Sequence, residues 1–261
     1  MIGMLALKGI PNEFHMKQGI RVFLTNLMTH KRKSISDSVE SVDISDLVDT
    51  TTIISIEQLS KDVISQRRGY YFAKRCLDVV ASIFALIFFS LPMALVAIAI
   101  RLEGPGPIFY TQERLGLNGE RFHLIKFRSM KINAETGGAQ WAKENDPRVT
   151  RVGRFIRSCR LDELPQFWQV LTGEMSLIGP RPEREIFYQA FEKYIPGFSQ
   201  RLLIKPGITG LAQVNGGYNL KPAEKILHDI EYIKTQSFWL DFKIIFMTVL
   251  VVLRGKNGGG R

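Results

Sequence analysis

Two adjacent carboxylates lie within an arginine-rich segment, and this pairing is the part of the chain best suited to chemistry. Asp162 and Glu163 follow arginines that recur at every third position: Arg148, Arg151, Arg154, Arg157 and Arg160. Guanidinium groups bind phosphate with paired hydrogen bonds, whereas carboxylates can hold a metal ion or attack an electrophile. The segment therefore predicts a site for a phosphorylated substrate, with the two carboxylates left for metal binding or attack.

The sequence allows two interpretations of the adjacent acids. On a helix, neighbouring side chains point about 100° apart, so Asp162 and Glu163 would not share a proton and would divide their roles. Pro165 follows within one turn and suits the first turn of a helix, where carboxylates are favoured. In the alternative interpretation, the acids only stabilise that helix end and pair with Arg157 or Arg160, and the arginines form a solvated face.

The turn that follows, Gly179–Pro182, would hold a charged side chain in a fixed position. Pro180 and Pro182 each fix their own φ angle and restrict the residue before them. Arg181 would therefore be presented rigidly to a ligand. In the alternative, the segment is an ordinary loop that contains an arginine by chance.

An uncharged apolar segment, residues 79–100, lies upstream of this site. As one helix it would be about 33 Å long, enough to span a bilayer. However, Pro92 follows Ser90 and Leu91 within it and would break or kink the helix. Basic residues flank both ends, which favours placing both on the cytoplasmic side. We therefore expect a re-entrant helix–break–helix in which Ser90 helps to satisfy the freed backbone groups; the alternative is a kinked ordinary span.

The composition favours one sizeable domain with an anionic partner. The chain has 261 residues, 45% of them hydrophobic, and a formal net charge of +10. This charge favours nucleic acid, anionic lipid or a phosphorylated substrate without choosing among them. Cys76 and Cys159 show neither metal-ligand spacing nor a disulfide framework, so we expect reduced thiols in a cytoplasmic setting. The N-terminal stretch is interrupted by Pro11 and is not expected to be a cleavable signal peptide.

Periodicity and turn signals predict the remaining elements. A β-hairpin is expected from strands at 108–112 and 121–127. Residues 238–253 should form a helix that lies in the membrane interface or, equally, packs on the domain. The other expected elements are a strand at 51–56, helices at 57–66, 152–168, 183–194 and 221–236, a loop at 134–146, and turns at 205–210 and 213–217.

Six ordered motifs resemble one known family. They are KRCLDVV before the broken apolar segment, GPIFYTQERLGLNGERFHLIKFRSM, RLDELPQ, MSLIGPRPE, KPGITGLAQVNG and HDIEYIKTQSFWLDFKII. Over residues 70–254 the chain resembles the bacterial sugar transferase family. These are monotopic polyprenol-phosphate phosphoglycosyl transferases that begin capsule, exopolysaccharide, O-antigen or glycoprotein assembly. Leu91 separates Ser90 from Pro92, which departs from the adjacent Ser-Pro pair usual in the family.

The resemblance implies an activity and a role for each matching residue. The enzyme would transfer a sugar 1-phosphate from a UDP-sugar to undecaprenyl phosphate and release UMP, in a ping-pong reaction. Asp162 would be the nucleophile that forms a phosphosugar-aspartyl intermediate, and Glu163 the acid associated with the cofactor Mg²⁺. The other implied roles are phosphate binding by Arg157 and Arg184, nucleotide binding by Pro180, Arg181 and Pro182, support by the acidic Asp229, and the membrane break at Ser90 and Pro92.

The elements and the resemblance together predict a mainly α-helical protein with a small β-hairpin, that is, a membrane-anchored monotopic α+β fold. It would comprise an extension at 1–69, a re-entrant helix at 70–102 and a catalytic domain at 103–261 that ends in an interfacial helix. We expect it on the cytoplasmic face of the bacterial inner membrane, in contact with membrane lipid and possible as a homodimer.

Three other functions compete with the transferase. A non-catalytic membrane adapter would use the basic face to bind anionic lipid, and a metal-dependent membrane phosphohydrolase would use the same site on water. A membrane-tethered nucleic-acid binder is disfavoured because the chain lacks stacking aromatics and a docking motif, so no nucleic-acid partner is expected.

Overall fold

The computed structural model describes residues 59, 67–134, 146–216 and 220–254. All of them belong to a compact unit that spans residues 42–261. The strand expected at 51–56, almost all of the helix expected at 57–66, and most of the loop expected at 134–146 lie outside the described residues. The described part is mainly helical, with two small two-stranded sheets.

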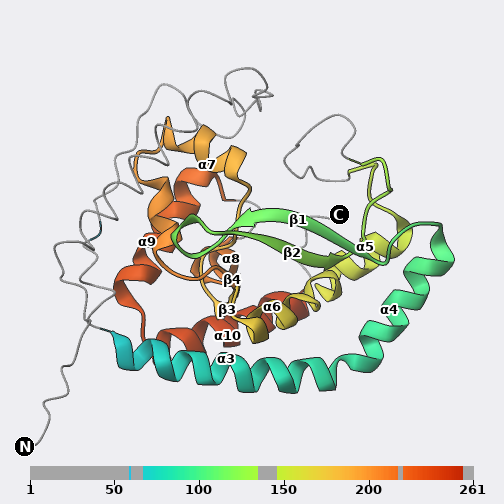
Figure 1. Cartoon of the computed structure of the whole chain (residues 1–261), viewed down its shortest axis with the longest axis horizontal. Coiled ribbons are helices and arrows are strands. Elements are labelled where there is room, and N and C mark those ends of the chain that lie inside the picture. The colour runs from blue at the N-terminus through green and yellow to red at the C-terminus, as the bar shows by residue number, and fades with distance from the viewer. Residues whose placement is uncertain (1–58, 60–66, 135–145, 217–219, 255–261) are drawn as a thin grey trace, which may run out of the picture. The chain divides into compact units, whose positions relative to one another are not determined.

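Two helices meet at the expected interruption of the apolar segment. α3 (Arg68–Phe88) and α4 (Ser90–Glu103) are separated at Phe89 and bent by 58° (Figure 1). Pro92 lies in the first turn of α4, where a missing N–H costs little. The Ser90 hydroxyl donates to the carbonyl of Ile87 at 2.7 Å and so satisfies one backbone group at the break, as the sequence predicts.

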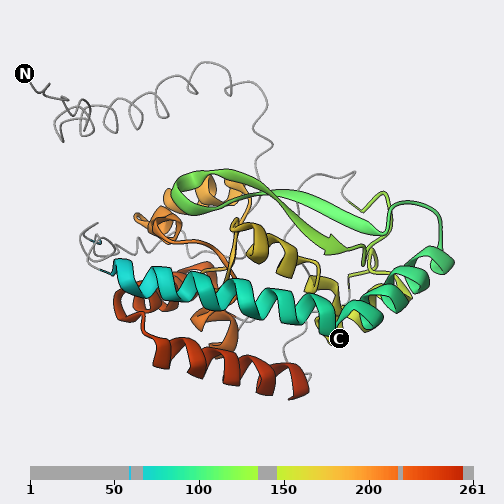
Figure 2. The same ribbon diagram turned by 60° about the horizontal axis from the view of Figure 1, so that its bottom comes forward.

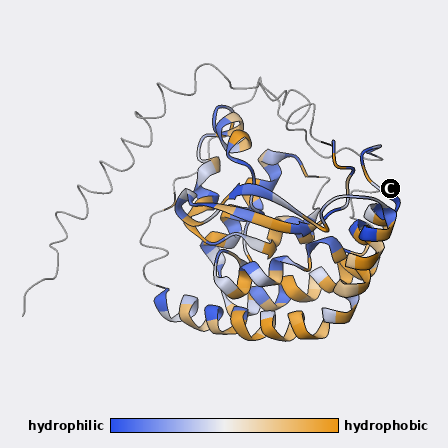
Figure 3. Ribbon diagram, turned by 45° about the vertical axis from the view of Figure 1, so that its right-hand side comes forward, coloured by the Kyte–Doolittle hydropathy of each residue, from blue (hydrophilic) through white to orange (hydrophobic). Residues whose placement is uncertain are grey.

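The outer faces of α3, α4 and α10 (Phe238–Arg254) are apolar and exposed. Figure 3 shows hydrophobic residues along α3 and α4. Within the described ranges no single helix has the length and hydrophobicity to cross a bilayer, while the bent pair α3–α4 meets both criteria when taken together. The exposed side chains include Phe72, Leu77, Val80, Phe84, Ile87, Phe88, Leu91, Leu95, Ile98, Trp239, Phe242, Phe246 and Val249.

The expected hairpin is present and somewhat longer than predicted. β1 (Phe109–Leu115) pairs antiparallel with β2 (Arg121–Phe127), and a 3₁₀ turn at Leu117–Gly119 joins them. Asn118 has a φ of 56°, a left-handed conformation that asparagine tolerates well. Phe122 and Leu124 of β2 face inward and pack with Val170 and Met175.

The helix expected at 152–168 is wrong, because the structure divides it into three pieces. α5 (Arg151–Ser158) is capped by Thr150, whose hydroxyl accepts a hydrogen bond from the amide of Gly153 at 2.9 Å. Arg160 then adopts a left-handed conformation with φ of 59°, which stops the helix. A 3₁₀ turn at Leu161–Glu163 follows, and α6 (Gln166–Thr172) starts after Pro165.

A second sheet was not predicted. β3 (Ser176–Ile178) pairs in parallel with β4 (Gly207–Thr209), so part of the expected turn at 205–210 is a strand. The turn expected at 213–217 is also wrong over 213–215, which belong to α8 (Leu211–Asn215), while Gly217 lies outside the described residues.

The remaining elements form the main hydrophobic core. α7 (Glu185–Glu192) and α9 (Pro222–Thr235) agree with the helices expected at 183–194 and 221–236, and a 3₁₀ helix spans Phe198–Leu203. α10 agrees with the helix expected at 238–253. Its inner side contributes the fully buried Ile244 to this core, so it packs on the domain along one face while the other stays exposed. Figure 2 shows α10 beside α3.

Candidate active site

Asp162 and Glu163 lie in the 3₁₀ turn between α5 and α6, and both are 8% exposed. Glu163 Oε1 accepts hydrogen bonds from Lys126 Nζ at 2.8 Å and from an Arg181 guanidinium nitrogen at 2.6 Å. Among the described residues, none donates a hydrogen bond to the Asp162 carboxylate. The two neighbouring acids are therefore in unlike settings, one tied to two cations and the other not.

Their electrostatics differ in the same sense. Burial and the negative charge of Glu163 together raise the pKa of Asp162 to about 6. Burial also opposes the charge of Glu163, but Arg181, Lys126 and Arg160 outweigh it and hold the pKa of Glu163 well below its usual range. The pair divides into a firmly ionised Glu163 and an Asp162 that is ionised at neutral pH but poorly solvated, which is the environment of an activated nucleophile or base.

The left-handed backbone at Arg160 sets the direction of this turn. Such a conformation is strained for a residue with a side chain and persists only when surrounding contacts enforce it. Here it lies two residues before Asp162 and redirects the chain between α5 and the 3₁₀ turn. The dyad is thus placed by a backbone feature that periodicity does not reveal.

The arginines of the repeat separate into groups. Arg148 is bound to Asp146 at 2.5 Å, whereas Arg151 and Arg154 are exposed on α5. Arg157 and Arg160 lower the pKa of Asp162 and therefore act electrostatically on the dyad. Only the last part of the repeat contributes to the candidate site, together with Lys126 and Arg181.

The turn Gly179–Pro182 is fixed by close contact with β4. A Cβ atom at Gly179 would lie 2.4 Å from the carbonyl oxygen of Lys205, and one at Gly207 would lie 2.1 Å from the amide nitrogen of Gly179. Because neither position has a side chain, the Gly179 amide can bond to Thr209, and the Gly207 amide to Pro180, each at 2.9 Å. These bonds hold the start of the turn against the sheet.

Two arginines, the buried Arg201 and the half-buried Arg114, hold the rest of the turn by its carbonyl groups. Arg201 donates to the carbonyl of Arg181 at 2.8 Å, and Arg114 donates to that of Pro182 at 3.2 Å. Each has an acidic partner: Arg201 pairs with Asp229 at 2.7 Å and Arg114 with Glu183 at 3.0 Å. With its backbone held in this way, Arg181 directs its side chain to Glu163.

The structure places the sequence-predicted residues in an inner group and a supporting group. Asp162, Glu163 and Arg181 come together, and Arg157 acts on them electrostatically. Asp229 reaches the turn through Arg201. The remaining residues lie elsewhere: Pro180 and Pro182 flank Arg181 in the turn, Arg184 precedes α7 and acts on Arg114, and Ser90 and Pro92 belong to the helix break.

Sequence reasoning missed Lys126, Arg201 and Arg114. For Lys126 a signal existed, because residues 122, 124 and 126 share one face of a strand, and Phe122 and Leu124 face inward. A lysine continuing an inward face indicates a buried ionic partner. Arg201 and Arg114 carried no comparable signal, since their roles depend on contacts with carbonyl groups far along the chain.

The oxygen donors at the dyad suit a magnesium ion. Mg²⁺ commonly takes one or two protein carboxylates and completes its shell with water and substrate phosphates. Glu163 Oε2 and the Asp162 carboxylate would be its ligands, since Glu163 Oε1 already binds two cations. Over the described ranges, no group of three or more His, Cys, Asp or Glu side chains is arranged to hold a metal ion. A magnesium ion at the dyad would therefore complete its shell with water or phosphate oxygens.

Similarity to known proteins extends over nearly the whole described region. Residues 69–255 match the bacterial sugar transferase family. A UDP-N-acetylgalactosamine-undecaprenyl-phosphate N-acetylgalactosaminephosphotransferase of Aeromonas hydrophila is 48% identical over 189 residues, which are 71% of this chain and 45% of that protein. UDP-glucose:undecaprenyl-phosphate glucose-1-phosphate transferases are also similar. That of Xanthomonas campestris pv. campestris is 40% identical over 217 residues, 78% of this chain and 45% of the relative.

The corresponding transferase of Escherichia coli (strain K12) is 43% identical over 181 residues, 67% of this chain and 39% of that protein. The chain thus spans less than half the length of these three relatives. The family match covers α3 to α10 and includes both the dyad and the turn that holds Arg181. On this similarity the chain belongs to the bacterial sugar transferase family.

Proposed function

We propose that the protein transfers a sugar 1-phosphate from a UDP-sugar to undecaprenyl phosphate and releases UMP. The observation that carries this proposal is the unequal dyad, in which a buried Asp162 adjoins a Glu163 held by Lys126 and Arg181. A nucleophile beside clustered cations is what displacement at a phosphorus atom requires. The names of the relatives, which act on UDP-sugars and undecaprenyl phosphate, support the same reaction.

The proposed reaction has two displacements at one phosphorus atom. In the first, an Asp162 carboxylate oxygen forms a bond to the sugar-linked phosphorus, and the bond to the bridging diphosphate oxygen breaks. UMP leaves with that electron pair. In the second, an oxygen of undecaprenyl phosphate attacks the same phosphorus, and the bond to Asp162 breaks. The carboxylate is regenerated, and the product is a lipid-linked sugar diphosphate.

The cationic side chains would stabilise the charge of the diphosphate. Arg181 is held by its backbone and can contact the nucleotide without reorganising, and Arg157 lies where it affects the dyad. Arg181 and Lys126 keep Glu163 ionised. Mg²⁺ held by Glu163 and Asp162 would supply further charge neutralisation when bound.

We also propose that α3 and α4 form a re-entrant membrane helix and that α10 lies in the interface. Support comes from the 58° bend and from the exposed apolar side chains on all three helices. The catalytic domain would then face the cytoplasm at the bacterial inner membrane. In a protein whose two native cysteines have been replaced, single cysteines introduced near residues 65 and 105 should both react with a reagent applied from the cytoplasmic side. Reaction from opposite sides would contradict re-entry.

The function is tested by UMP release from UDP-N-acetylgalactosamine, UDP-glucose and UDP-galactose, with and without undecaprenyl phosphate, in Mg²⁺ and in EDTA. We expect turnover with one donor that needs both acceptor and metal. Exchange of labelled UMP into the UDP-sugar without acceptor would support the covalent intermediate, and Asp162→Asn should abolish it. Sugar phosphate released to water without acceptor would instead indicate a phosphohydrolase, and no release with any donor would favour the membrane adapter.

A further inference from the structure

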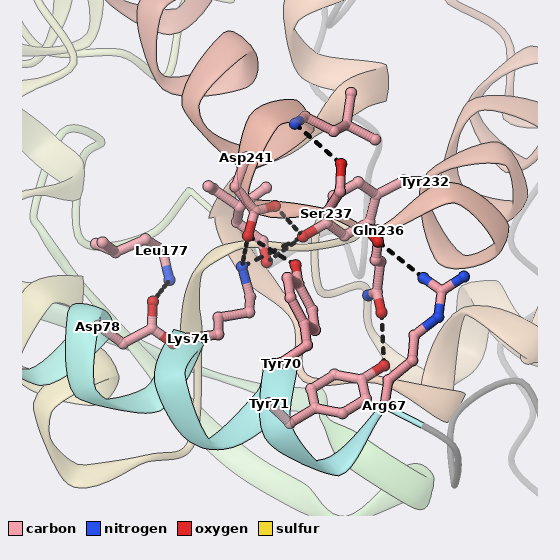
Figure 4. Close-up of polar contacts among 12 residues, drawn as sticks. Arg67, Tyr70, Tyr71, Lys74, Asp78, Leu177, Tyr232, Gln236, Ser237 and Asp241 are labelled. Atoms are coloured by element: carbon pink, nitrogen blue, oxygen red, sulfur yellow. Dashed lines mark hydrogen bonds and ion pairs between the residues drawn. The ribbon is translucent and has the colours of Figure 1, made fainter.

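A buried polar cluster joins the first turns of α3 to α9 and α10 (Figure 4). Asp241 of α10 is its centre: Oδ2 accepts hydrogen bonds from Tyr70 at 2.7 Å and Lys74 at 2.8 Å, and Oδ1 accepts one from Tyr232 at 2.7 Å. We call Tyr70, Lys74, Tyr232 and Asp241 the α3–α10 cluster. Lys74 also lies 3.3 Å from the Tyr232 hydroxyl. One carboxylate thereby ties together three helices.

The cluster is costly to bury. Lys74 and Asp241 are each 7% exposed and Tyr232 is 1% exposed. A buried ion pair gains little net stability over apolar side chains of similar size, because both charges lose their hydration. What such a pair supplies in several systems is a unique register between the elements that carry it. The cost of burial therefore points to positioning rather than to stability alone.

Only one register of α3 satisfies Asp241. The residues one turn away from Lys74 on its face are Tyr70 and Asp78, so a shift of α3 by one turn would place either a neutral hydroxyl or a second carboxylate against Asp241. The neighbouring cation, Arg75, is already bound to the carbonyl of Leu171 at the end of α6, at 2.7 Å. A slipped helix would thus leave a buried charge unpaired, which is strongly unfavourable.

Two further contacts, one from α3 and one from the cluster residue Tyr232, reach the strand that leads into the candidate site. The Asp78 carboxylate accepts a hydrogen bond from the amide of Leu177 at 3.0 Å, and the Tyr232 hydroxyl lies 3.4 Å from the carbonyl of Ile178. Both belong to β3, and Gly179 of the turn follows directly. The position of α3 is therefore coupled to the turn that carries Arg181 within a few hydrogen bonds.

We infer that the α3–α10 cluster is a positioning device that sets the lipid-facing helices α3 and α4 in register with the Gly179–Pro182 turn. This inference rests on the proposed function, since it assigns the cluster to the step in which the lipid acceptor meets the phosphosugar. Its members touch neither reactant and act through the alignment of α3. A misplacement of about 1 Å at a reacting phosphate can cost on the order of a hundred-fold in rate.

The test replaces the buried pair as a whole, with Lys74→Met and Asp241→Leu combined. This double variant leaves no uncompensated charge, although the Tyr70 and Tyr232 hydroxyls lose their acceptor, so we expect it to fold with a Tm close to that of wild type. Exchange of labelled UMP into the UDP-sugar, which needs only the donor, should stay within about two-fold of wild type, while transfer to undecaprenyl phosphate should fall by about a hundred-fold. Full retention of transfer at an unchanged Tm would overturn the inference, and so would a parallel loss of both steps.

Tyr71→Phe is the matched control. Tyr71 also joins α3 to the end of α9, through a 2.6 Å hydrogen bond to Gln236, but it does not touch Asp241. Its loss should leave the ratio of the two half-reactions unchanged, whereas Tyr70→Phe with Tyr232→Phe should lower transfer selectively. If the wild-type protein shows no exchange of UMP into the UDP-sugar, the result counts against the proposed function. The role of the α3–α10 cluster is then tested by a second measurement.

This second measurement does not depend on activity. In a Cys76→Ser, Cys159→Ser background, spin labels at Ile87 and Gln189, both exposed, report the distance between the end of α3 and α7 in lipid nanodiscs. We expect one narrow distance distribution in the otherwise wild-type cluster and a broader or shifted one in the double variant. Superimposable distributions would show that α3 keeps its register without the cluster.

Discussion

Arg201 and Asp229 form an ion pair at 2.7 Å in which both side chains are 2% exposed. The other end of the Arg201 guanidinium donates to the carbonyl of Arg181, so this buried pair is a support for the residue that binds Glu163. The pair lies behind the site rather than in it.

Replacing one member of the Arg201–Asp229 pair should lower the stability of the protein, whereas replacing both members should lower it much less. Asp229→Asn removes the ion-pair partner of the buried Arg201, and we expect a loss of about 3–5 kcal/mol in the free energy of unfolding. Arg201→Met combined with Asp229→Leu should recover most of that stability but raise KM for the UDP-sugar, because the Arg181 carbonyl loses its donor. Chemical unfolding and donor kinetics measure the two effects. Equal stability of the single and double variants would contradict the assigned role.

The rate of the donor step should depend on the ionisation of Asp162. Burial and the adjacent Glu163 raise the pKa of Asp162 to about 6, and only the ionised carboxylate can attack phosphorus. UMP exchange measured at low UDP-sugar concentration should therefore fall below about pH 6, by roughly ten-fold for each further pH unit. A rate that stays level down to the ordinary pKa range of an aspartate would remove Asp162 as the nucleophile.

Asp162→Asn should stabilise the fold while it abolishes activity. The folded-state pKa of Asp162 lies above its unfolded value, so the folded state holds the proton more tightly and loses stability as pH rises through the interval between the two values. Above about pH 7 the wild type carries this cost in full, roughly 1–3 kcal/mol, and the neutral asparagine avoids it. Tm measured for both proteins should diverge as pH rises through this interval and stay apart above it. A lower Tm for the variant at neutral pH would contradict the burial argument.

A methyl group at Gly179 should disrupt the turn. Its Cβ would lie 2.4 Å from the Lys205 carbonyl oxygen and 2.9 Å from the Gly207 amide nitrogen, both backbone atoms that cannot rotate away. Gly179→Ala is therefore expected to lower stability by more than about 2 kcal/mol and to reduce donor binding. Gly69→Ala on α3 is the control, because nothing lies within 4 Å of its added methyl. That variant should be neutral or gain up to about 1 kcal/mol.

Local patterns were sufficient for the elements that depend on neighbouring residues. The break before Pro92, the hairpin and the helices α7, α9 and α10 follow from proline chemistry, turn residues and periodicity. The interruption of the helix at Arg160 could not be predicted in this way. An arginine gives no local signal for a left-handed backbone, and this conformation is imposed by surrounding contacts. The parallel pair β3–β4 was not predicted for a related reason, because two three-residue strands are too short to show an alternation of hydrophobic and polar residues.

For the candidate site, residue types indicated the chemistry but not the partners. Asp162, Glu163 and Arg181 were recognised from motif and resemblance, and the structure brings them together. Lys126, Arg201 and the α3–α10 cluster depend on contacts between segments far apart in the sequence. The ion pair between Lys74 and Asp241 was especially hard to predict. A lysine beside an apolar segment is usually interpreted as a charge that flanks a membrane segment, and an aspartate on an apolar helix as a residue at the membrane interface.

The parallel ladder between β3 and β4 also affects the order in which the protein folds during synthesis. It joins positions about thirty residues apart, whereas the β1–β2 hairpin closes over a short turn and needs far less loop-closure entropy. As the chain leaves the ribosome, the hairpin and the dyad emerge before the strand that supports Pro180. The turn that carries Arg181 is therefore completed only once residue 209 has been translated, so a nascent chain holds its two carboxylates before the Arg181 side chain can be positioned beside them.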